Sequence, residues 1–323
     1  MTYRDLMRLA NGYAESKVLL VANELGLFTA IGDGGKRADS LAAACGVTCE
    51  GMKLLLQALV GLGLVRANAG RYWNSRLGAK YLDARSQTAV TNLLWLLNHH
   101  WSDWTGMAQA IRRGRSGWAP VTKTAVFRRR FALAMHERSY MLAPRTLDGI
   151  RLQRGATRLL DLGGGSGAYS IALAQRHPDA HVLLVDQAVS VARRHISEAG
   201  LRDRVAVRQG DVLTAPLDSG FDGVLLSNLL HDLSEAENRG LLRRVHGALR
   251  QGGKIVIVEY FLNPAGTLPA EAAVFSLLMY AFTPTGRSYA WKEVETWLTA
   301  TGFGRFRRRS VTDSIGTLEA VRR

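Results

Sequence analysis

A glycine-rich segment near the middle of the chain could bind a nucleotide-like ligand. The stretch Arg158-Leu-Leu-Asp-Leu-Gly-Gly-Gly-Ser-Gly167 predicts a short buried strand, then a glycine loop, then the start of a helix. Glycine accepts positive φ and lets a ligand approach the main chain closely, and open α/β sheets bind nucleotides at such loops. The loop fits G-x-G-x-G through Gly163, Gly165 and Gly167. It also fits the looser dinucleotide pattern G-x-G-x-x-A, which ends at Ala168, so the loop alone leaves the ligand open.

Two carboxylates follow the next predicted strands. Asp186 comes directly after the strand predicted over 181–185, and Asp211 follows the strand predicted over 204–208. An acid at the first position can accept hydrogen bonds from both ribose hydroxyls of an adenosine, which suits NAD and S-adenosylmethionine equally. A carboxylate at the second position can accept a hydrogen bond from the adenine amino group. The spacing therefore predicts an adenosine site.

Two further strands bring a histidine and a carboxylate to the same edge of the sheet. The strand predicted over 221–227 ends with Ser227 and is followed by His231, and the strand predicted over 254–259 ends with Glu259. A histidine, with an unperturbed pKa of about 6.5, can take the proton of an attacking hydroxyl. A carboxylate on its other ring nitrogen would fix the tautomer and stabilise the imidazolium. These residue types favour general-base chemistry beside the glycine loop.

Short apolar runs alternate with helical segments from Thr157 onward, which is typical of βαβ units and a parallel sheet. The predicted strands cover 158–162, 181–185, 204–208, 221–227 and 254–259, with two more near 306–311 and 317–321. The predicted helices cover 167–176, 188–199, 235–249, 270–282 and 291–301. The second half of the chain is therefore expected to be an α/β domain whose strand ends carry the residues above.

The first 100 residues predict a mostly helical domain. A helix is expected over 14–28, and Ser40 and Thr48 are candidate caps of two short helices, the first of which ends at Gly46. A hairpin is predicted over 64–73. The order of helix, turn, helix and hairpin is that of a winged helix.

The second of these short helices argues against DNA binding. Its residues 49–63 are apolar on almost every side and include one basic residue, Lys53. A recognition helix needs polar and basic side chains for base edges and phosphates. We therefore expect this helix to be buried in a dimer interface, with no nucleic-acid partner.

Residues 101–150 predict a second helical segment that is rich in aromatic side chains. Its helices, with the helix at 270–282, are expected to wall a substrate pocket. The expected wall residues are Trp101, Trp104, Phe131, Met135, Met279 and Phe282. The chain is thus expected to divide into a domain over 1–100, a pocket segment over 101–150 and a cofactor-binding domain over 151–323.

The composition excludes several classes of protein. The chain has 323 residues, of which 47% are hydrophobic, and a formal net charge of +15. Its two cysteines, Cys45 and Cys49, cannot form a four-cysteine zinc site, and no metal is expected. No apolar run reaches the roughly 18–20 residues that span a bilayer, and the charged N-terminus does not resemble a signal peptide. A cytoplasmic protein with a basic surface and no membrane partner is expected.

Five motifs occur in the order and at the intervals of a known enzyme family. They are Asp161-Leu-Gly-Gly-Gly-Ser-Gly167, Asp186, Gly210-Asp211, Leu230-His-Asp-Leu233 and Gly252-Gly-Lys-Ile-Val-Ile-Val-Glu259. With them the chain resembles the S-adenosylmethionine-dependent O-methyltransferases of the plant caffeate and bacterial hydroxyneurosporene type. The resemblance covers nearly the whole chain and implies a Rossmann-like class I methyltransferase domain with a mostly parallel seven-stranded sheet. It also implies an N-terminal, mainly α winged-helix dimerisation domain, and hence a homodimer.

The resemblance implies a role for each motif residue. The residues that would bind S-adenosylmethionine are Asp161, Gly163, Gly165, Asp186, Asp211, Val212 and Ser227. His231 matches the general base of the family, and Glu259 matches one of the two acids that flank this histidine. The expected reaction is methyl transfer to a hydroxyl of a small aromatic or polyketide-like secondary metabolite.

One segment departs from the family pattern. The second flanking acid usually lies in Gly-[Lys/Gly]-Glu-Arg-Thr, but the segment here is Gly286-Arg-Ser-Tyr-Ala290, so Ser288 stands where the glutamate would be. A hydroxyl cannot replace a carboxylate electrostatically, so the base would be less activated or the chemistry different. The alternatives are a C-methyltransferase, for example on a pigment macrocycle, and a relative that uses the bound cofactor for non-methylating chemistry. A winged-helix DNA-binding regulator is the alternative from another class.

Overall fold

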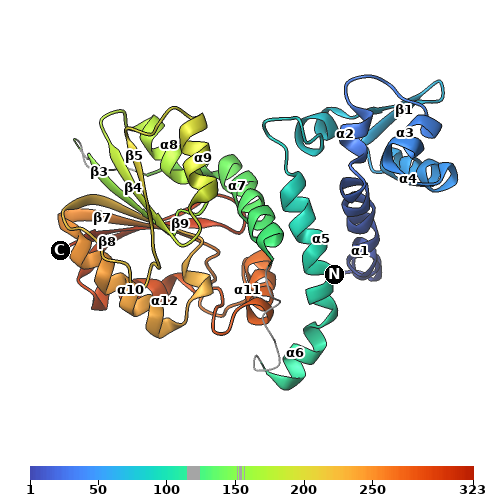
Figure 1. Cartoon of the computed structure of the whole chain (residues 1–323). Helices are drawn as coiled ribbons and strands as arrows, with labels where there is room; N and C mark the ends of the chain where they lie inside the picture. Colours follow the sequence, from blue (N-terminus) through green and yellow to red (C-terminus); the bar gives the residue numbers. More distant parts are fainter. Residues whose placement is uncertain (115–123, 151, 153–154, 156) are drawn as a thin grey trace. The chain divides into compact units, whose positions relative to one another are not determined.

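The chain forms two compact units, Met1–Ser102 and Asp103–Arg323 (Figure 1). The computed structural model describes residues 1–114, 124–150, 152, 155 and 157–323. Within this described part, no single helix is long and apolar enough to cross a membrane, although one bent pair, Ala38–Cys45 with Cys49–Gly61, passes that test together. The division predicted from the sequence, with boundaries at 100 and 150, stays a prediction.

The N-terminal unit is mostly helical and contains the predicted hairpin. Its elements are α1 (Tyr3–Glu24), α2 (Leu27–Ile31), α3 (Ala38–Cys45), α4 (Cys49–Gly61), β1 (Val65–Asn68), β2 (Arg71–Asn74), the π-helical turn η1 (Gly78–Leu82) and most of α5 (Thr91–Thr105), which crosses the boundary at Ser102. Helix α1 begins well before the predicted start at Ala14, because Thr2 and Asp5 form a capping box. The Thr2 hydroxyl accepts a hydrogen bond from the Asp5 N–H, and the Asp5 carboxylate accepts one from the Thr2 N–H.

The two predicted caps have different outcomes. The prediction for Thr48 is confirmed, since its hydroxyl accepts a hydrogen bond of 3.2 Å from the Gly51 N–H at the start of α4. The prediction for Ser40 is wrong. Helix α3 already begins at Ala38, and Arg37 precedes it without a capping side-chain hydrogen bond.

Helix α4 buries one face within its own unit. Met52, Leu56 and Leu59 are fully buried in the core of the N-terminal unit, and their spacing places them along one side of the helix. Leu54 is 61% exposed. One face of α4 is thus buried within the single chain, and burial of the helix in a dimer interface stays a prediction.

The C-terminal unit contains the predicted seven-stranded, mostly parallel sheet, in the order β5-β4-β3-β6-β7-β9-β8. The strands are β3 (Arg158–Leu162), β4 (His181–Asp186), β5 (Val205–Gln209), β6 (Phe221–Ser227), β7 (Leu249–Glu259), β8 (Phe303–Ser310) and β9 (Gly316–Arg322). Its helices are α6 (Met107–Arg113), α7 (Ala125–Leu147), α8 (Ala168–Arg176), α9 (Ser190–Glu198), η3 (Leu230–Asp232), α10 (Glu235–Ala248), α11 (Ala270–Phe282) and α12 (Trp291–Ala300). Strand β9 runs antiparallel to both β7 and β8.

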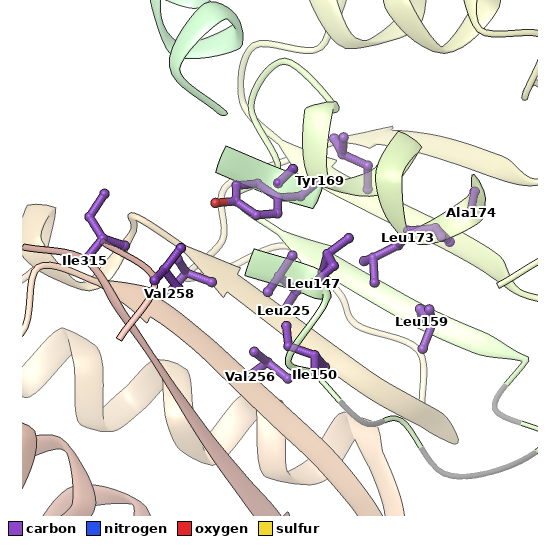
Figure 2. Packing of buried hydrophobic residues seen from close by; sticks show 14 of the residues in the cluster. Leu147, Ile150, Leu159, Tyr169, Leu173, Ala174, Leu225, Val256, Val258 and Ile315 are labelled. Atoms are coloured by element: carbon purple, nitrogen blue, oxygen red, sulfur yellow. The ribbon is translucent and has the colours of Figure 1, made fainter. Parts of the chain in front are cut away.

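The two faces of the sheet carry separate hydrophobic cores. Helices α7, α8 and α9 cover one face, and α10 and α12 cover the other (Figure 1). On the first face, Leu147 of α7 and Tyr169 and Leu173 of α8 pack over Leu225 and Val256 of the sheet (Figure 2). Because side chains alternate along a strand, each buried strand supplies both cores. Each fully buried leucine stabilises the fold by about 1.5–3 kcal/mol relative to an exposed one.

The strand order reverses between β3 and β6. Strand β3 continues through β4 to β5 on one side, and β6 continues to β7 on the other. Ligands bind in open α/β sheets at the carboxyl ends of the strands beside such a reversal. The glycine loop follows β3, and the segment with His231 follows β6, so the topology brings the two predicted motifs to the same place.

Candidate active site

The glycine loop connects β3 to α8 through left-handed backbone. Gly163, Gly165 and Gly167 have φ angles of 79°, 54° and 81°, which favour glycine. The Gly163 N–H donates a hydrogen bond of 2.8 Å to the carbonyl of Val185, which fixes the loop to β4. A Cβ at Gly165 would have no neighbour within 4 Å, so this part of the loop faces open space.

Asp161 lies beneath this loop. Its carboxyl is fully buried, and Oδ2 accepts a hydrogen bond of 2.6 Å from the Ser170 hydroxyl on α8. A Cβ at Gly164 would lie only 2.7 Å from the same oxygen, so the loop rests directly on the carboxyl group. Burial raises the pKa of Asp161 to about 7. Oδ1 is buried and has no hydrogen-bond partner in the described part of the chain, so it remains available to a donor from a ligand.

Asp186 and Asp211 extend the site along the edge of the sheet. At the end of β4, the Asp186 carboxylate accepts hydrogen bonds from the N–H groups of Gly165 (2.9 Å) and Ala188 (2.8 Å). Asp211 follows β5 and accepts a hydrogen bond of 3.0 Å from the side chain of Gln187. Both acids thus accept hydrogen bonds from the segment that follows β4. Val212 and Ser227, which the sequence also predicts here, are both 9% exposed.

His231 and Glu259 form a buried pair, as their places in the sequence predict. His231 lies in η3 and is 8% exposed, and Glu259 ends β7 and is 4% exposed. The Nδ1 atom of His231 lies 2.8 Å from Oε2 of Glu259. The same carboxylate accepts hydrogen bonds from the N–H groups of Leu230 (3.0 Å) and Tyr260 (3.1 Å). Its orientation is therefore fixed by three neighbouring groups.

The surrounding charges control the protonation of this pair. Because Glu259 accepts at Nδ1, the neutral imidazole carries its proton there and leaves Nε2 as an acceptor. Burial lowers the pKa of His231, but attraction to Glu259 and then to Asp232 outweighs burial, so the pKa lies above its usual value. The Asp232 Oδ1 atom lies 3.9 Å from Nε2. The pair can take up a proton at Nε2 and stabilise the resulting charge.

Sequence reasoning missed an aromatic wall around this pair. The ring of Phe275 on α11 meets the His231 ring edge to face, with 4.9 Å between centroids. Phe275 also stacks on Tyr260 at 4.1 Å, and the guanidinium of Arg138 on α7 lies 5.1 Å from the centre of the Tyr260 ring. Tyr260 directly follows Glu259 in the sequence and could have been noticed there. Phe275 and Arg138 lie far away in sequence, and no motif identified them.

The predicted wall residues lie in different environments. Trp101 belongs to the N-terminal unit, where it packs against the core and lies under the Lys17 ammonium. Phe131 stacks on Phe127 within α7 and is 40% exposed. The remaining residues are partly exposed Trp104 and Met135, and buried Met279. Phe282 ends α11, and its side chain lies outside the described part of the structure. Their arrangement around one pocket stays a prediction.

Ser288 does not take the place of a second acid. Its side chain is buried, and its hydroxyl donates a hydrogen bond of 3.2 Å to the carbonyl of Ala272 in α11. Its N–H donates to the hydroxyl of Ser276. The serine thus joins its segment to α11, and the carboxylate beside Nε2 of His231 is that of Asp232.

A pair of histidines that contacts Ser166 of the glycine loop was also not predicted from the sequence. The rings of His136 on α7 and His195 on α9 lie 3.7 Å apart. His136 Nδ1 lies 3.2 Å from the hydroxyl of Ser166 in the loop, and His195 Nδ1 lies 3.3 Å from the carbonyl of the same serine. Burial, with the nearby charges of His195 and Arg194, lowers the pKa of His136 to about 4. The neutral pair connects two helices to the loop.

Known proteins are similar to this chain along its whole length. Residues 101–304 match the family model of the O-methyltransferase domain, and residues 7–84 match that of the O-methyltransferase dimerisation domain. Acetylserotonin O-methyltransferase of Mus musculus is 33% identical over 99% of this chain and 88% of its own length. The 3-hydroxy-5-methyl-1-naphthoate 3-O-methyltransferase of Streptomyces sahachiroi is 30% identical over 92% of this chain and 88% of its own. The solved structure of human N-acetylserotonin methyltransferase in complex with SAM has a TM-score of 0.89, at 25% identity, and the match covers 99% of this chain and 97% of that one.

The histidine pair should make the fold sensitive to acid. The pKa of His136 is about 4 in the folded chain and about 6.5 in an unfolded one. Between these values the unfolded chain binds a proton that the folded chain does not, so the free energy of unfolding falls as the pH falls. In denaturant titrations from about pH 7.5 to about pH 5, His136→Gln should flatten this decrease. His181→Gln, at an exposed position, is the control. If the free energy of unfolding depends on pH equally in both variants, the lowered pKa of His136 is contradicted.

Proposed function

The chain belongs to the family of S-adenosylmethionine-dependent O-methyltransferases, and from this we propose a reaction and a role for each residue of the site. The proposed reaction is methyl transfer to a hydroxyl of a small aromatic or polyketide-like molecule, with His231 as the general base. The observation that carries the proposal is the 2.8 Å contact between His231 Nδ1 and Glu259. It leaves Nε2 as the one ring nitrogen of His231 that can accept a proton.

The residues around the glycine loop fit the cofactor. S-adenosylmethionine presents hydrogen-bond donors in its amino acid, ribose and adenine parts, and the site offers acceptors for them. These are the unpartnered Oδ1 of Asp161 and the carboxylates of Asp186 and Asp211, which have further lone pairs. We assign Gly163, Gly165, Val212 and Ser227 to the surface on which the cofactor lies. When bound, it supplies a methyl group on a positively charged sulfur.

His231 removes the proton of the acceptor hydroxyl in the proposed mechanism. A phenol of pKa about 10 is mostly protonated at pH 7, so a base at the reacting oxygen lowers the barrier. Nε2 accepts the proton, and the imidazolium then lies between Glu259 on its Nδ1 side and Asp232, 3.9 Å from Nε2. Asp232 supplies a negative charge near Nε2, whereas Ser288, which stands at the sequence position of the family's second acid, donates its hydroxyl to Ala272.

The relatives support an aromatic acceptor. The mouse and Streptomyces enzymes are named for acetylserotonin and for a hydroxynaphthoate, both of which are hydroxylated aromatic compounds. The stacked rings of Phe275 and Tyr260 make the surroundings of His231 aromatic, which suits an acceptor of this kind. We propose that the six wall residues predicted from the sequence enclose the rest of the acceptor.

We propose that the enzyme is a homodimer. The dimerisation family model matches residues 7–84. Several large apolar side chains in this range are exposed in the single chain, and a second copy would remove them from water. They include Leu9, Tyr13, Leu54 and Leu77.

Removal of the base should abolish most of the activity. His231→Ala should lower kcat on phenolic acceptors by about 10²- to 10⁴-fold, the usual contribution of a general base. Calorimetric affinity for S-adenosylmethionine should stay within about twofold, because no assigned cofactor contact is lost. His181→Ala, at an exposed position, is the control. Undiminished transfer in His231→Ala would exclude the base and favour methylation of carbon, or another reaction of the bound cofactor.

Glu259→Gln should shift the pH profile in a defined direction. The raised pKa of His231 depends on the Glu259 carboxylate, so its loss lowers that pKa and moves the rise of kcat/KM with pH to lower pH. The plateau rate should fall as well, since a neutral amide stabilises the imidazolium less. Glu295→Gln, which removes a carboxylate paired with Arg308 instead, is the control. A profile shifted to higher pH would overturn this account.

Ser288→Ala should affect the fold rather than the chemistry. It removes a buried hydrogen bond to Ala272, which stabilises the fold by about 1 kcal/mol. In thermal or denaturant unfolding the variant should be slightly less stable, and kcat should change by less than about twofold. A loss of kcat above about tenfold with normal stability would show that Ser288 takes part in the reaction.

A further inference from the structure

Arg138 is a charged group in this site that the mechanism above does not use. It lies on α7, is partly buried, and has its guanidinium 5.1 Å from the Tyr260 ring centre and 6.0 Å from that of Phe275. Phe275 in turn meets the His231 ring at 4.9 Å. The guanidinium and the general base therefore both lie beside the ring of Phe275.

Within the described part of the chain, the guanidinium of Arg138 forms no hydrogen bond or ion pair. It lies over the rings of Tyr260 and Phe275. Glu259, the acid whose charge acts on it, already accepts from His231, Leu230 and Tyr260. A guanidinium over an aromatic ring keeps its five donors in its own plane, where they can bind an oxyanion.

Burying the charged guanidinium of Arg138 without an anion beside it costs free energy. Burial lowers the pKa of Arg138, and the charge of Glu259 only partly offsets this, yet an arginine remains charged in proteins. A partly buried charge is stabilised by an opposite charge with good hydrogen-bond geometry. Arg138 lies 6.0 Å from the ring centre of Phe275, and the His231 ring lies 4.9 Å from the same centre, so the cation and the base are neighbours of one aromatic side chain.

We propose that Arg138 binds a carboxylate, or a similar oxyanion, on the aromatic acceptor and so makes the enzyme selective for acidic hydroxyaromatic substrates. The inference rests on the proposed function, because it takes the acceptor hydroxyl to lie at His231. The net charge of +15 also favours acidic substrates, since a basic protein attracts anionic ligands. The carboxylate of the cofactor has the same chemistry, and the test separates the two.

The test compares hydroxybenzoic and hydroxynaphthoic acids with the corresponding neutral amides, which differ in charge but hardly in shape. Their dissociation constants are measured with bound S-adenosylhomocysteine, which prevents turnover, and their KM values with S-adenosylmethionine. The variants are Arg138→Gln, Arg138→Lys and the control Arg145→Gln, which removes an exposed arginine from the same helix.

Arg138→Gln should weaken binding of the acids by about 10- to 100-fold, the strength of a charge-assisted hydrogen bond. Binding of the amides and of S-adenosylmethionine should change by less than about twofold, and Arg138→Lys should recover part of the loss. Equal losses for acids and amides would show a structural role, and a loss confined to S-adenosylmethionine would assign Arg138 to the cofactor. Either result, or no loss at all, overturns the proposal.

The results that would contradict the proposed function differ from those that would contradict the role of Arg138. If His231→Ala methylates the hydroxyl of the preferred probe as fast as the wild type, the general base is wrong, whatever the preference for acids. If the wild type binds and methylates acids and amides equally well while His231 remains essential, the role of Arg138 alone is excluded. If the wild type neither binds nor methylates any probe, both proposals fail.

Discussion

The chemistry that we propose depends on the hydrogen bond between Nδ1 of His231 and the carboxylate of Glu259. A buried carboxylate is costly unless its oxygens are satisfied, and here two main-chain N–H groups hold it in addition to the imidazole. The sheet brings the two residues together. Ser227 at the end of β6 pairs with Val258 of β7, and the Asn228 N–H then donates to the Val258 carbonyl. With φ at 51°, Asn228 turns the chain into η3, so that His231 lies against the end of the neighbouring strand.

The glycine loop between β3 and α8 is held by two acids and by a pair of histidines. Asp161 lies under Gly164, and the Asp186 carboxylate accepts from Gly165, so each of these acids fixes one part of the loop before any ligand arrives. The histidine pair behind Ser166 connects the loop to α7 and α9. Helix α7 also carries Arg138, which lies over the Tyr260 ring beside the pair of His231 and Glu259. This helix therefore contacts both the glycine loop and the aromatic residues beside His231.

The sequence predicted the elements whose signals are local. Strands β3 and β6 have the predicted bounds, because continuous apolar runs end there at glycine or polar residues. The pair of His231 and Glu259 could also be predicted, since parallel strands carry their C-terminal residues to one edge. The early start of α1 was missed because its capping box precedes a polar first turn. The contacts of His136, Phe275 and Arg138 could not be predicted, since they join residues that are distant in sequence and depend on how α7, α9 and α11 pack on the sheet.

The most direct test of the account is the ring protonation of His231, measured by ¹⁵N NMR of protein with labelled histidine and assigned with His231→Ala. In the neutral form, we expect the proton on Nδ1 and a bare Nε2, with a pKa above the usual value for histidine. Glu259→Gln should lower that pKa, because the attracting carboxylate is gone. A proton on Nε2 in the neutral ring, or a pKa that does not respond to Glu259→Gln, would contradict the account.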